Sequence, residues 1–206
     1  MSAADIKTKR DEPAFYDCLD STLDYCWRLF QAGVTDRQCA FHMPTLATVR
    51  PDGTPSIRTV VLRSVDPDRR QLRFHTDIRS SKVGEITEQP RVAVHFYDAK
   101  SKVQLRIDGT ASLHHDDAAA AKAWRGTRPL SRQCYRVEQN PGTAIADPTE
   151  AFAPSDWQDD EAGRSNFAAV TISFDALEWL YLSAHGHRRA QFTWHDGDMR
   201  ATWLVP

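Results

Sequence analysis

The stretch from Pro44 to Lys82, PTLATVRPDGTPSIRTVVLRSVDPDRRQLRFHTDIRSSK, decides the fold. It contains three runs rich in β-branched residues, at 46–49, 56–64 and 71–76, and such runs favour strands. The segments 51–54 (PDGT) and 66–68 (DPD) separate them with residues typical of tight turns. The stretch therefore predicts a three-stranded meander with a central middle strand at 56–64.

Hydroxyl and cationic side chains gather where the third run ends. Residues 75–82, HTDIRSSK, lead into a predicted helix over 82–88. Backbone N–H groups at a helix start are unpaired and favour negative charge, so amides, hydroxyls and Lys82 together form a candidate phosphate site. The alternative is an ordinary helix with a serine N-cap. Arg58 and Arg63, near the two ends of the middle run, are either solvated strand ends or part of this site.

Length and composition predict one soluble domain spanning 1–206. The chain is 41% hydrophobic and 26% charged with a net charge of −2, and this balance gives no reason to expect a nucleic-acid partner. We find no apolar run of the roughly 18–20 residues that a membrane helix needs and no signal peptide. Four cysteines without a C-x-x-C motif are typical of reduced thiols, so we expect a cytoplasmic protein without a membrane partner.

The first 35 residues are predicted to form a helix over 13–32 that packs on the rest of the fold. Phe15, Leu19, Leu23, Cys26 and Phe30 recur at spacings of three and four, up to a helix end at Gly33. Trp27 lies one position off this stripe, where it either widens the stripe or faces a partner subunit, and we favour the first.

Beyond residue 90 the pattern alternates between strands and short helices. Counting the first three runs, we expect nine strands in an antiparallel barrel with helices packed outside. Residues 140–160 are rich in Pro, Asp and Thr and predict a long surface loop. The further strands are expected at 91–97, 103–113, 169–174, 177–183, 189–195 and 199–205, and the helices at 116–126 and 128–132.

Two histidine-containing segments are candidates for metal sites. His114 and His115 precede two aspartates, and His185 and His187 are spaced so that a strand would point both the same way. Since the spacing suggests no third ligand, we expect no metal. The sequence also contains no G-x-G-x-x-G, Walker or G-x-S-x-G motif, which removes the usual signals of dinucleotide, nucleoside triphosphate and α/β-hydrolase sites.

Five motifs in order resemble the FMN-binding split barrel of the pyridoxamine 5'-phosphate oxidase family, over about residues 40–205. They are Arg58-Thr-Val-Val-Leu-Arg63, Phe74-His-Thr76, Ser80-Ser81-Lys82, Gln89-Pro-Arg-Val92 and the segment from Val103 to Gly109. The resemblance implies a mainly β (α+β) fold: an antiparallel split barrel of six or more strands with peripheral helices. It also implies FMN as cofactor, bound between the subunits of a homodimer.

By this resemblance, Arg58 and Lys82 would neutralise the FMN phosphate and Thr76 and Ser81 would donate to it. Gln104 would reach the flavin across the barrel, and the backbone from Arg58 to Arg63 would follow the flavin edge. The full implied cofactor set is Arg58, Thr59, Val60, Val61, Leu62, Arg63, His75, Thr76, Arg79, Ser80, Ser81, Lys82 and Gln104.

Several positions depart from the family pattern. Ser81 replaces an Arg, for which Arg79 is the nearest substitute, His75 replaces a Tyr and Arg63 replaces a Lys. Where the family holds the substrate phosphate with a Tyr, an Arg and a Ser, this chain has Trp124, Arg128 and Arg132. His187 and Arg189 fall in the C-terminal segment that holds the rest of the substrate.

The resemblance thus implies an FMN-dependent oxidoreductase that transfers hydride from a small, anionic substrate to flavin N5. The alternative is a flavin-binding or haem-handling split-barrel protein without pyridoxamine phosphate oxidase activity. The substrate stays open, because function depends on the residues of the site and not on the fold.

Overall fold

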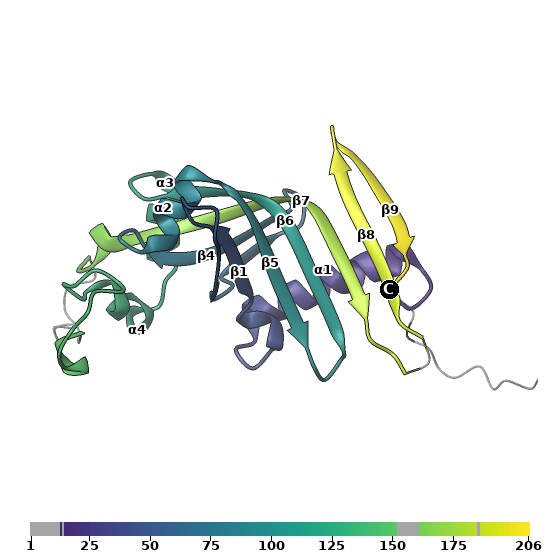
Figure 1. Ribbon diagram of the computed structural model, residues 1–206, viewed down its shortest axis with the longest axis horizontal. Helices are drawn as coiled ribbons and strands as arrows, with labels where there is room; N and C mark the ends of the chain where they lie inside the picture. The colour runs from purple at the N-terminus through teal and green to yellow at the C-terminus, as the bar shows by residue number, and fades with distance from the viewer. Residues whose placement is uncertain (1–12, 14, 152–160, 185) are drawn as a thin grey trace, which may run out of the picture.

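The computed structural model describes residues 13, 15–151, 161–184 and 186–206. In this part of the chain nine strands form one antiparallel sheet, paired in the order β2-β1-β5-β6-β7-β4-β3, with β8 added to β7 and β9 to β8 (Figure 1). The predicted antiparallel β fold with peripheral helices is confirmed, but the sheet is not closed: its path ends at β2 and β3. The strands are β1 Thr45–Val49, β2 Pro55–Thr59, β3 Ser64–Asp66, β4 Gln71–Asp77, β5 Arg91–Asp98, β6 Val103–His114, β7 Phe167–Tyr181, β8 Arg188–His195 and β9 Asp198–Leu204.

The predicted central strand over 56–64 is wrong, because its two halves lie at opposite ends of the sheet. Residues 55–59 pair with β1, and residues 64–66 pair with β4. Between them the backbone changes partner: Val60 N donates to Pro44 O at 2.9 Å, whereas Arg63 N donates to Arg73 O at 2.8 Å. The apolar run predicted extended backbone correctly, but its pairing depends on segments that are distant in sequence.

The two strands predicted at 169–174 and 177–183 are one strand, β7, with an irregularity at its middle. The register against β6 shifts between Asp108 and Gly109, so the strand bulges near Asp175 and continues. Gly109 is required at this point: a Cβ there would lie 2.7 Å from the carbonyl oxygen of Ser173. The bulge explains why the alternation of apolar residues is interrupted without ending the strand.

The first helix, α1, spans Leu19–Thr35 and not 13–32. Cys26 and Phe30 are fully buried, which confirms the predicted packing stripe. Gly33 lies inside the helix and does not end it. A glycine is needed there because a Cβ would lie 2.6 Å from the carbonyl oxygen of Phe41, so the absence of a Cβ permits close packing. Trp27 contacts Phe30 and Phe174 and widens the stripe, as predicted.

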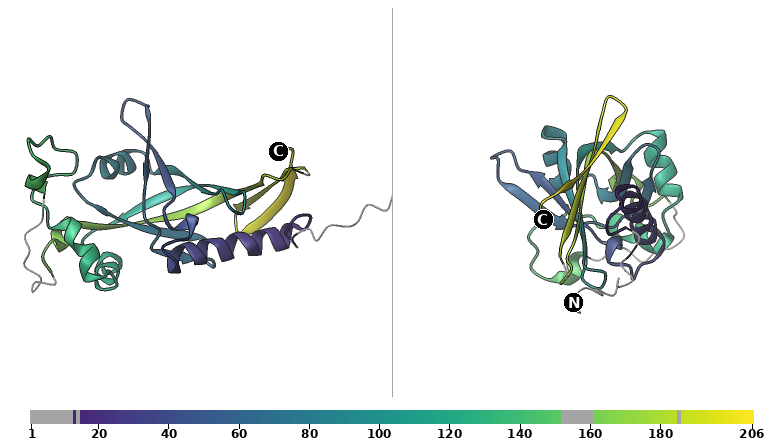
Figure 2. Two further views of the ribbon diagram at one scale, coloured as in Figure 1. Left: turned by 90° about the horizontal axis from the view of Figure 1, so that it is seen from below. Right: turned by 90° about the vertical axis from the view of Figure 1, so that its right-hand side faces the viewer.

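One face of the sheet is covered by helix α1, and the other is partly exposed to solvent. Helix α1 runs along the first face, where it closes the main core (Figures 1 and 2). The short helix α3, Ala118–Arg125, packs on β7 at one end of the molecule, far from the β8–β9 hairpin (Figures 1 and 2). The outer face of β2, β1 and β5 exposes Ile57, at 72% of its surface, and Tyr97, at 44%.

The remaining elements agree with the predicted positions to within a few residues. The long loop has regular structure only in a short 3₁₀ turn among its described residues 140–151, and residues 152–160 of that prediction lie outside the described part. Among the described residues, no helix is long and apolar enough to cross a membrane. The remaining helices are α2 Ser81–Glu88 and α4 Pro129–Arg132, and the 3₁₀ turns are Ala40–His42, Gln133–Tyr135, Pro148–Ala151 and Arg164–Asn166.

Candidate functional site

The end of β4 and the start of α2 form a cluster of hydroxyls around one ammonium group. Lys82 Nζ donates to Thr76 Oγ1 and to Ser80 Oγ, both at 3.1 Å, and the two hydroxyls lie 3.1 Å from each other. Burial lowers the pKa of Lys82, and the nearby charge of Arg58 lowers it further. No carboxylate of the described residues lies within 4 Å of this ammonium. The cluster therefore has a half-buried cation with neutral partners, which suits an anion.

Arg58 lies on β2 and faces the same region, but part of its guanidinium forms an ion pair with a carboxylate. Arg58 Nη2 lies 2.7 Å from Glu85 Oε2 of α2 and also donates to Ser56 Oγ at 2.7 Å. Burial alone would raise the pKa of Glu85, but hydrogen bonds from Thr48 and Arg58 outweigh it and lower the pKa. Arg58 is thus held firmly next to α2, with part of its charge already neutralised.

Arg79 is directed away from the Lys82 cluster. Its guanidinium forms an ion pair with Asp77 at 2.7 Å and donates to the carbonyl oxygens of Val137 and Glu138, each at 2.9 Å. These contacts attach the segment after the α4 region to the end of β4. The contacts of Arg79 are thus structural ones, with Asp77 and with two backbone carbonyls. Its guanidinium does not reach the place of the family Arg that Ser81 replaces.

The backbone from residue 59 to 63 offers a donor at its middle. Val60 and Leu62 are buried, and their N–H groups donate to the carbonyl oxygens of Pro44 and His42. The intervening N–H of Val61 has no acceptor among the described residues, and Thr59 is exposed. This alternation leaves one main-chain donor free on the side away from the core, where the family resemblance expects the flavin edge. Ser81 is exposed at the first position of α2.

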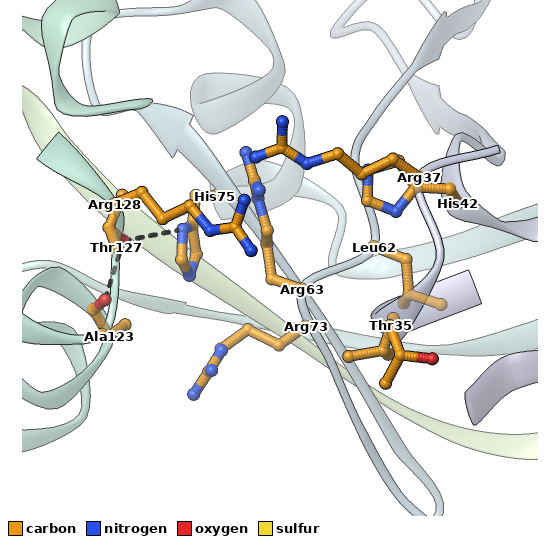
Figure 3. A pocket seen from close by; sticks show the side chains of 12 residues that line it. Thr35, Arg37, His42, Leu62, Arg63, Arg73, His75, Ala123, Thr127 and Arg128 are labelled. Carbon is orange, nitrogen blue, oxygen red and sulfur yellow. Dashed lines mark hydrogen bonds between the residues drawn. The ribbon is translucent and has the colours of Figure 1, made fainter. Parts of the chain in front are cut away.

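A second site lies on the outer side of β4, the side opposite to the buried Leu72, Phe74 and Thr76. Figure 3 shows the side chains that line it. Its cavity of about 230 Å³ is lined by four guanidinium side chains, Arg37, Arg63, Arg73 and Arg128. His42 and His75 complete the polar lining, and none of the twelve lining residues is acidic. The arginines come from four separate segments: the loop after α1, the crossover 60–63, strand β4, and the N-cap of α4.

His75 is neutral in this cavity. Burial, with the nearby charges of Arg73 and Arg63, lowers its pKa from 6.5 to about 3. Its Nδ1 lies 3.3 Å from the hydroxyl of Thr127, and its Nε2 is buried without a hydrogen-bond partner. The positive charge of the cavity at neutral pH therefore comes from the arginines.

Trp124 and Arg132 lie beneath the cavity and do not line it. Trp124 is 1% exposed and packs in a small core with Tyr135 and Phe167. Arg132 stacks on the indole at 4.8 Å and donates to the carbonyl oxygens of Trp124 and Thr127. These contacts hold the end of α3, so of the three residues expected around the substrate phosphate only Arg128 reaches the cavity in this chain.

Gln104, His187 and Arg189 lie far from Lys82 within one chain. In the strand register Gln104 of β6 and Arg189 of β8 both stand opposite Leu180 of β7, on the outer face. Arg189 pairs with Glu178 at 2.8 Å, and His187 is exposed. This end of the sheet is opposite the end that carries α3 (Figure 1). The predicted site residues therefore fall into two separated groups.

The sequence reading missed Arg37 and Arg73. Arg73 had a usable signal, since it lies two residues before His75 on one strand and must share its face. Arg37 had none, because it lies in a loop whose position depends on tertiary packing. No group of three potential metal ligands exists among the described residues. His185 of the His185–His187 pair lies outside them.

Residues 25–115 match the family model described as pyridoxamine 5'-phosphate oxidase, FMN-binding domain. A pyridoxine/pyridoxamine 5'-phosphate oxidase from Rubrobacter xylanophilus is 40% identical over 88 residues, 43% of this chain, and the matched stretch spans only 39% of that relative's length. One from Cupriavidus necator is 35% identical over 186 residues, covering 87% of this chain and 86% of the relative. The structure resembles that of a pyridoxamine 5'-phosphate oxidase-related, FMN binding protein from Nostoc punctiforme (TM-score 0.73, 23% identity, covering 90% of this chain and 96% of the other).

Proposed function

Because the chain belongs to the pyridoxamine 5'-phosphate oxidase family, we propose that it is an FMN-dependent oxidoreductase acting on a small, anionic substrate. The observation that carries the proposal is the Lys82 cluster, a half-buried ammonium with two hydroxyl partners at the start of a helix. Bound FMN would accept a hydride at N5 from an amine, an alcohol or a reduced nicotinamide. The protein would supply binding, orientation and charge.

The residues of the first site fit a phosphate group. Lys82 and Arg58 bring positive charge, Ser80 and Thr76 bring hydroxyls, and the unpaired N–H groups of the α2 start favour an anion. The free N–H of Val61 would donate to the flavin edge. In the second site, Arg63 and Arg128 would orient an anionic substrate group.

The test is the absorbance spectrum of the purified protein, before and after a screen of reductants. Bleaching of bound flavin by an anionic amine, an alcohol or NADPH, with recovery in air, would support an oxidoreductase. A flavin that binds but is reduced by none of them would favour the alternative, a flavin-binding protein without oxidoreductase activity. A protein that stays colourless and ignores added FMN would contradict the proposal.

Replacing Lys82 by Ala is expected to weaken FMN binding by about ten- to a hundredfold, because each charge-assisted hydrogen bond contributes roughly 1.5–3 kcal/mol. A titration of the apoprotein followed by flavin fluorescence measures the dissociation constant. Lys100→Ala, which removes an exposed lysine from the β5–β6 turn, is the matched control and should leave the constant unchanged. Equal affinities for Lys82→Ala and the unchanged protein would exclude the cluster as the phosphate site.

We further propose a homodimer in which each subunit completes the other's flavin site. Gln104 and Arg189 share the outer face of the sheet but lie at the opposite end from Lys82, so one chain does not assemble the whole set. The same face bears exposed apolar side chains, of which Ile57 is the most exposed. A second copy packed on this face would cover them and bring Gln104 toward the partner's cofactor.

Ile57→Asp is therefore expected to weaken dimer formation by at least about tenfold, since truncating a buried interface anchor typically costs about 2 kcal/mol or more. Sedimentation velocity over a concentration series measures the shift. Met199→Asp is the control, because Met199 is exposed at the tip of the β8–β9 hairpin and points to the opposite face. A single-chain mass for the unchanged protein at micromolar concentration, with FMN bound, would refute the dimer.

A further inference from the structure

Within the described part of the chain, the four arginine side chains of the second site have no hydrogen-bond or ion-pair partner. None of the guanidinium groups of Arg37, Arg63, Arg73 and Arg128 forms a hydrogen bond or an ion pair with any residue that the structure describes. The Nε atoms of Arg63 and Arg73 are buried without a partner. Arg63 and Arg73 are partly buried, whereas Arg37 and Arg128 are exposed to solvent. The partly buried Arg58 and Arg79, by contrast, pair with Glu85 and Asp77. The buried, unpartnered Nε atoms of Arg63 and Arg73, on the wall of a cavity that no acidic residue lines, indicate a ligand that supplies the missing acceptors.

The charge of the cavity exceeds what one anionic group can match. Its lining contains four permanently charged guanidinium groups and no carboxylate, and His75 adds no charge at neutral pH. A bidentate arginine places two parallel hydrogen bonds on one carboxylate or phosphate, and such a group accepts few arginines at once. A ligand with a single anionic group would leave some of these cations unmatched.

The arginines are also arranged in two directions. In Figure 3 the side chains of Arg37, Arg63 and Arg128 extend toward the same part of the cavity, whereas that of Arg73 extends away from them. Arg73 also lines a neighbouring cavity of about 530 Å³, together with the cations Arg69 and Lys122 and one carboxylate, Asp66, which pairs with Arg69. Arg73 therefore lies at the junction of the two cavities, where a second anionic group of an elongated ligand would reach it.

We propose that this site selects a ligand with two separate anionic groups, one held by Arg37, Arg63 and Arg128 and the other by Arg73. The proposal rests on the proposed function, since it names the class of substrate: a diacid, such as a dicarboxylate or a carboxylate that also carries a phosphate. Arg73 is then a specificity residue that distinguishes diacids from monoacids of similar length. It binds the substrate at the end away from the three converging arginines.

Isothermal titration of the full chain, saturated with FMN, tests the proposal with four probes. Glutarate is compared with butyrate and pyrophosphate with orthophosphate, so that each pair differs in the number of anionic groups. The two-anion probe is expected to bind at least about tenfold tighter than its partner. Arg73→Gln should remove this advantage and leave butyrate and orthophosphate unchanged, whereas Arg128→Gln should weaken all four.

Arg69→Gln is the control, because Arg69 lines the neighbouring cavity but is largely exposed; it should change none of the affinities. Arg73→Met, which removes the charge but keeps a long side chain, replaces Arg73→Gln if the latter fails to show a cooperative melt. Equal binding of one- and two-anion probes, equal weakening of both series by the Arg73 variant, or no binding at all would overturn the proposal. Flavin absorbance, read before each titration, reports FMN loading separately and so distinguishes failure of the cofactor site from failure of this one.

Discussion

Replacing Arg58 by Ala is expected to lower the free energy of unfolding by about 3 kcal/mol, because it leaves the Glu85 carboxylate buried without its partner. The Glu85 side chain is 6% exposed and lies 2.7 Å from the guanidinium. For a chain of this size, such a loss lowers the melting temperature by about 6–12 °C. FMN affinity should fall as well, since the same guanidinium faces the phosphate site.

The pH dependence gives this prediction a second readout. In the unchanged protein the pKa of Glu85 is lowered, so its contribution to stability is present above the carboxyl pKa of the unfolded chain, about 4.3, and is lost as the pH falls. Without Arg58, burial raises that pKa, and Glu85 is penalised at neutral pH but not when protonated. The stability gap between Arg58→Ala and the unchanged protein should therefore narrow toward pH 4.

Urea unfolding at pH 7 and pH 4 measures both effects. Arg91→Ala is the matched control: Arg91 pairs with Asp175 at 2.5 Å, but both side chains are about half exposed, so the expected loss is at most about 1 kcal/mol. The double replacement Arg58→Met with Glu85→Met should recover stability without recovering FMN affinity, because it removes the buried charge and the cation together. Equal losses in the free energy of unfolding for Arg58→Ala and Arg91→Ala would show that the buried ion pair stabilises the fold no more than the exposed one.

Activity on pyridoxine 5'-phosphate and pyridoxamine 5'-phosphate is expected to be weak or absent, with kcat/KM below about 10⁴ M⁻¹s⁻¹. By the family resemblance, a Tyr, an Arg and a Ser hold the substrate phosphate. Here Trp124 and Arg132 are buried under the end of α3, and Arg128 alone of the three lines the cavity. Arg37 adds a further cation beside Arg63 and Arg128, and Arg73 adds one from another direction, so a phosphate ester would bind but be misplaced. An error of about 1 Å can cost about 10²-fold in rate.

Steady-state formation of pyridoxal phosphate measures this activity, with the Cupriavidus necator relative assayed in parallel as the reference. The flavin content of both preparations is matched by absorbance, so that a low rate reflects the substrate site and not missing cofactor. A rate equal to that of the relative would mean that the buried Trp124 and Arg132 are compatible with productive binding. Our reading of the second site would then be wrong.

Local patterns predicted most elements of this chain because their causes are local. The turn at 51–54 follows from Asp52 and Gly53: the Asp52 carboxylate accepts from Thr54 N at 2.9 Å, and Gly53 adopts a φ of 83°. The hydroxyls and the lysine around 76–82 predicted an anion site, and they do cluster. Pairing was less predictable, since the single run 56–64 contributes to both ends of the sheet.

By itself, the sequence determined most of the individual strands and helices, the packing stripe of α1 and the Lys82 cluster. Each of these depends on residues within a few positions of one another, whose side-chain direction follows from helix or strand geometry. Only the tertiary structure decided that Arg58 would be partly neutralised by Glu85, that Arg79 would hold a loop and that Trp124 and Arg132 would be buried. It also decided that Arg37 and Arg73 would line the same cavity as Arg63 and Arg128. The neighbours of a charged side chain depend on how segments that are remote along the chain pack together.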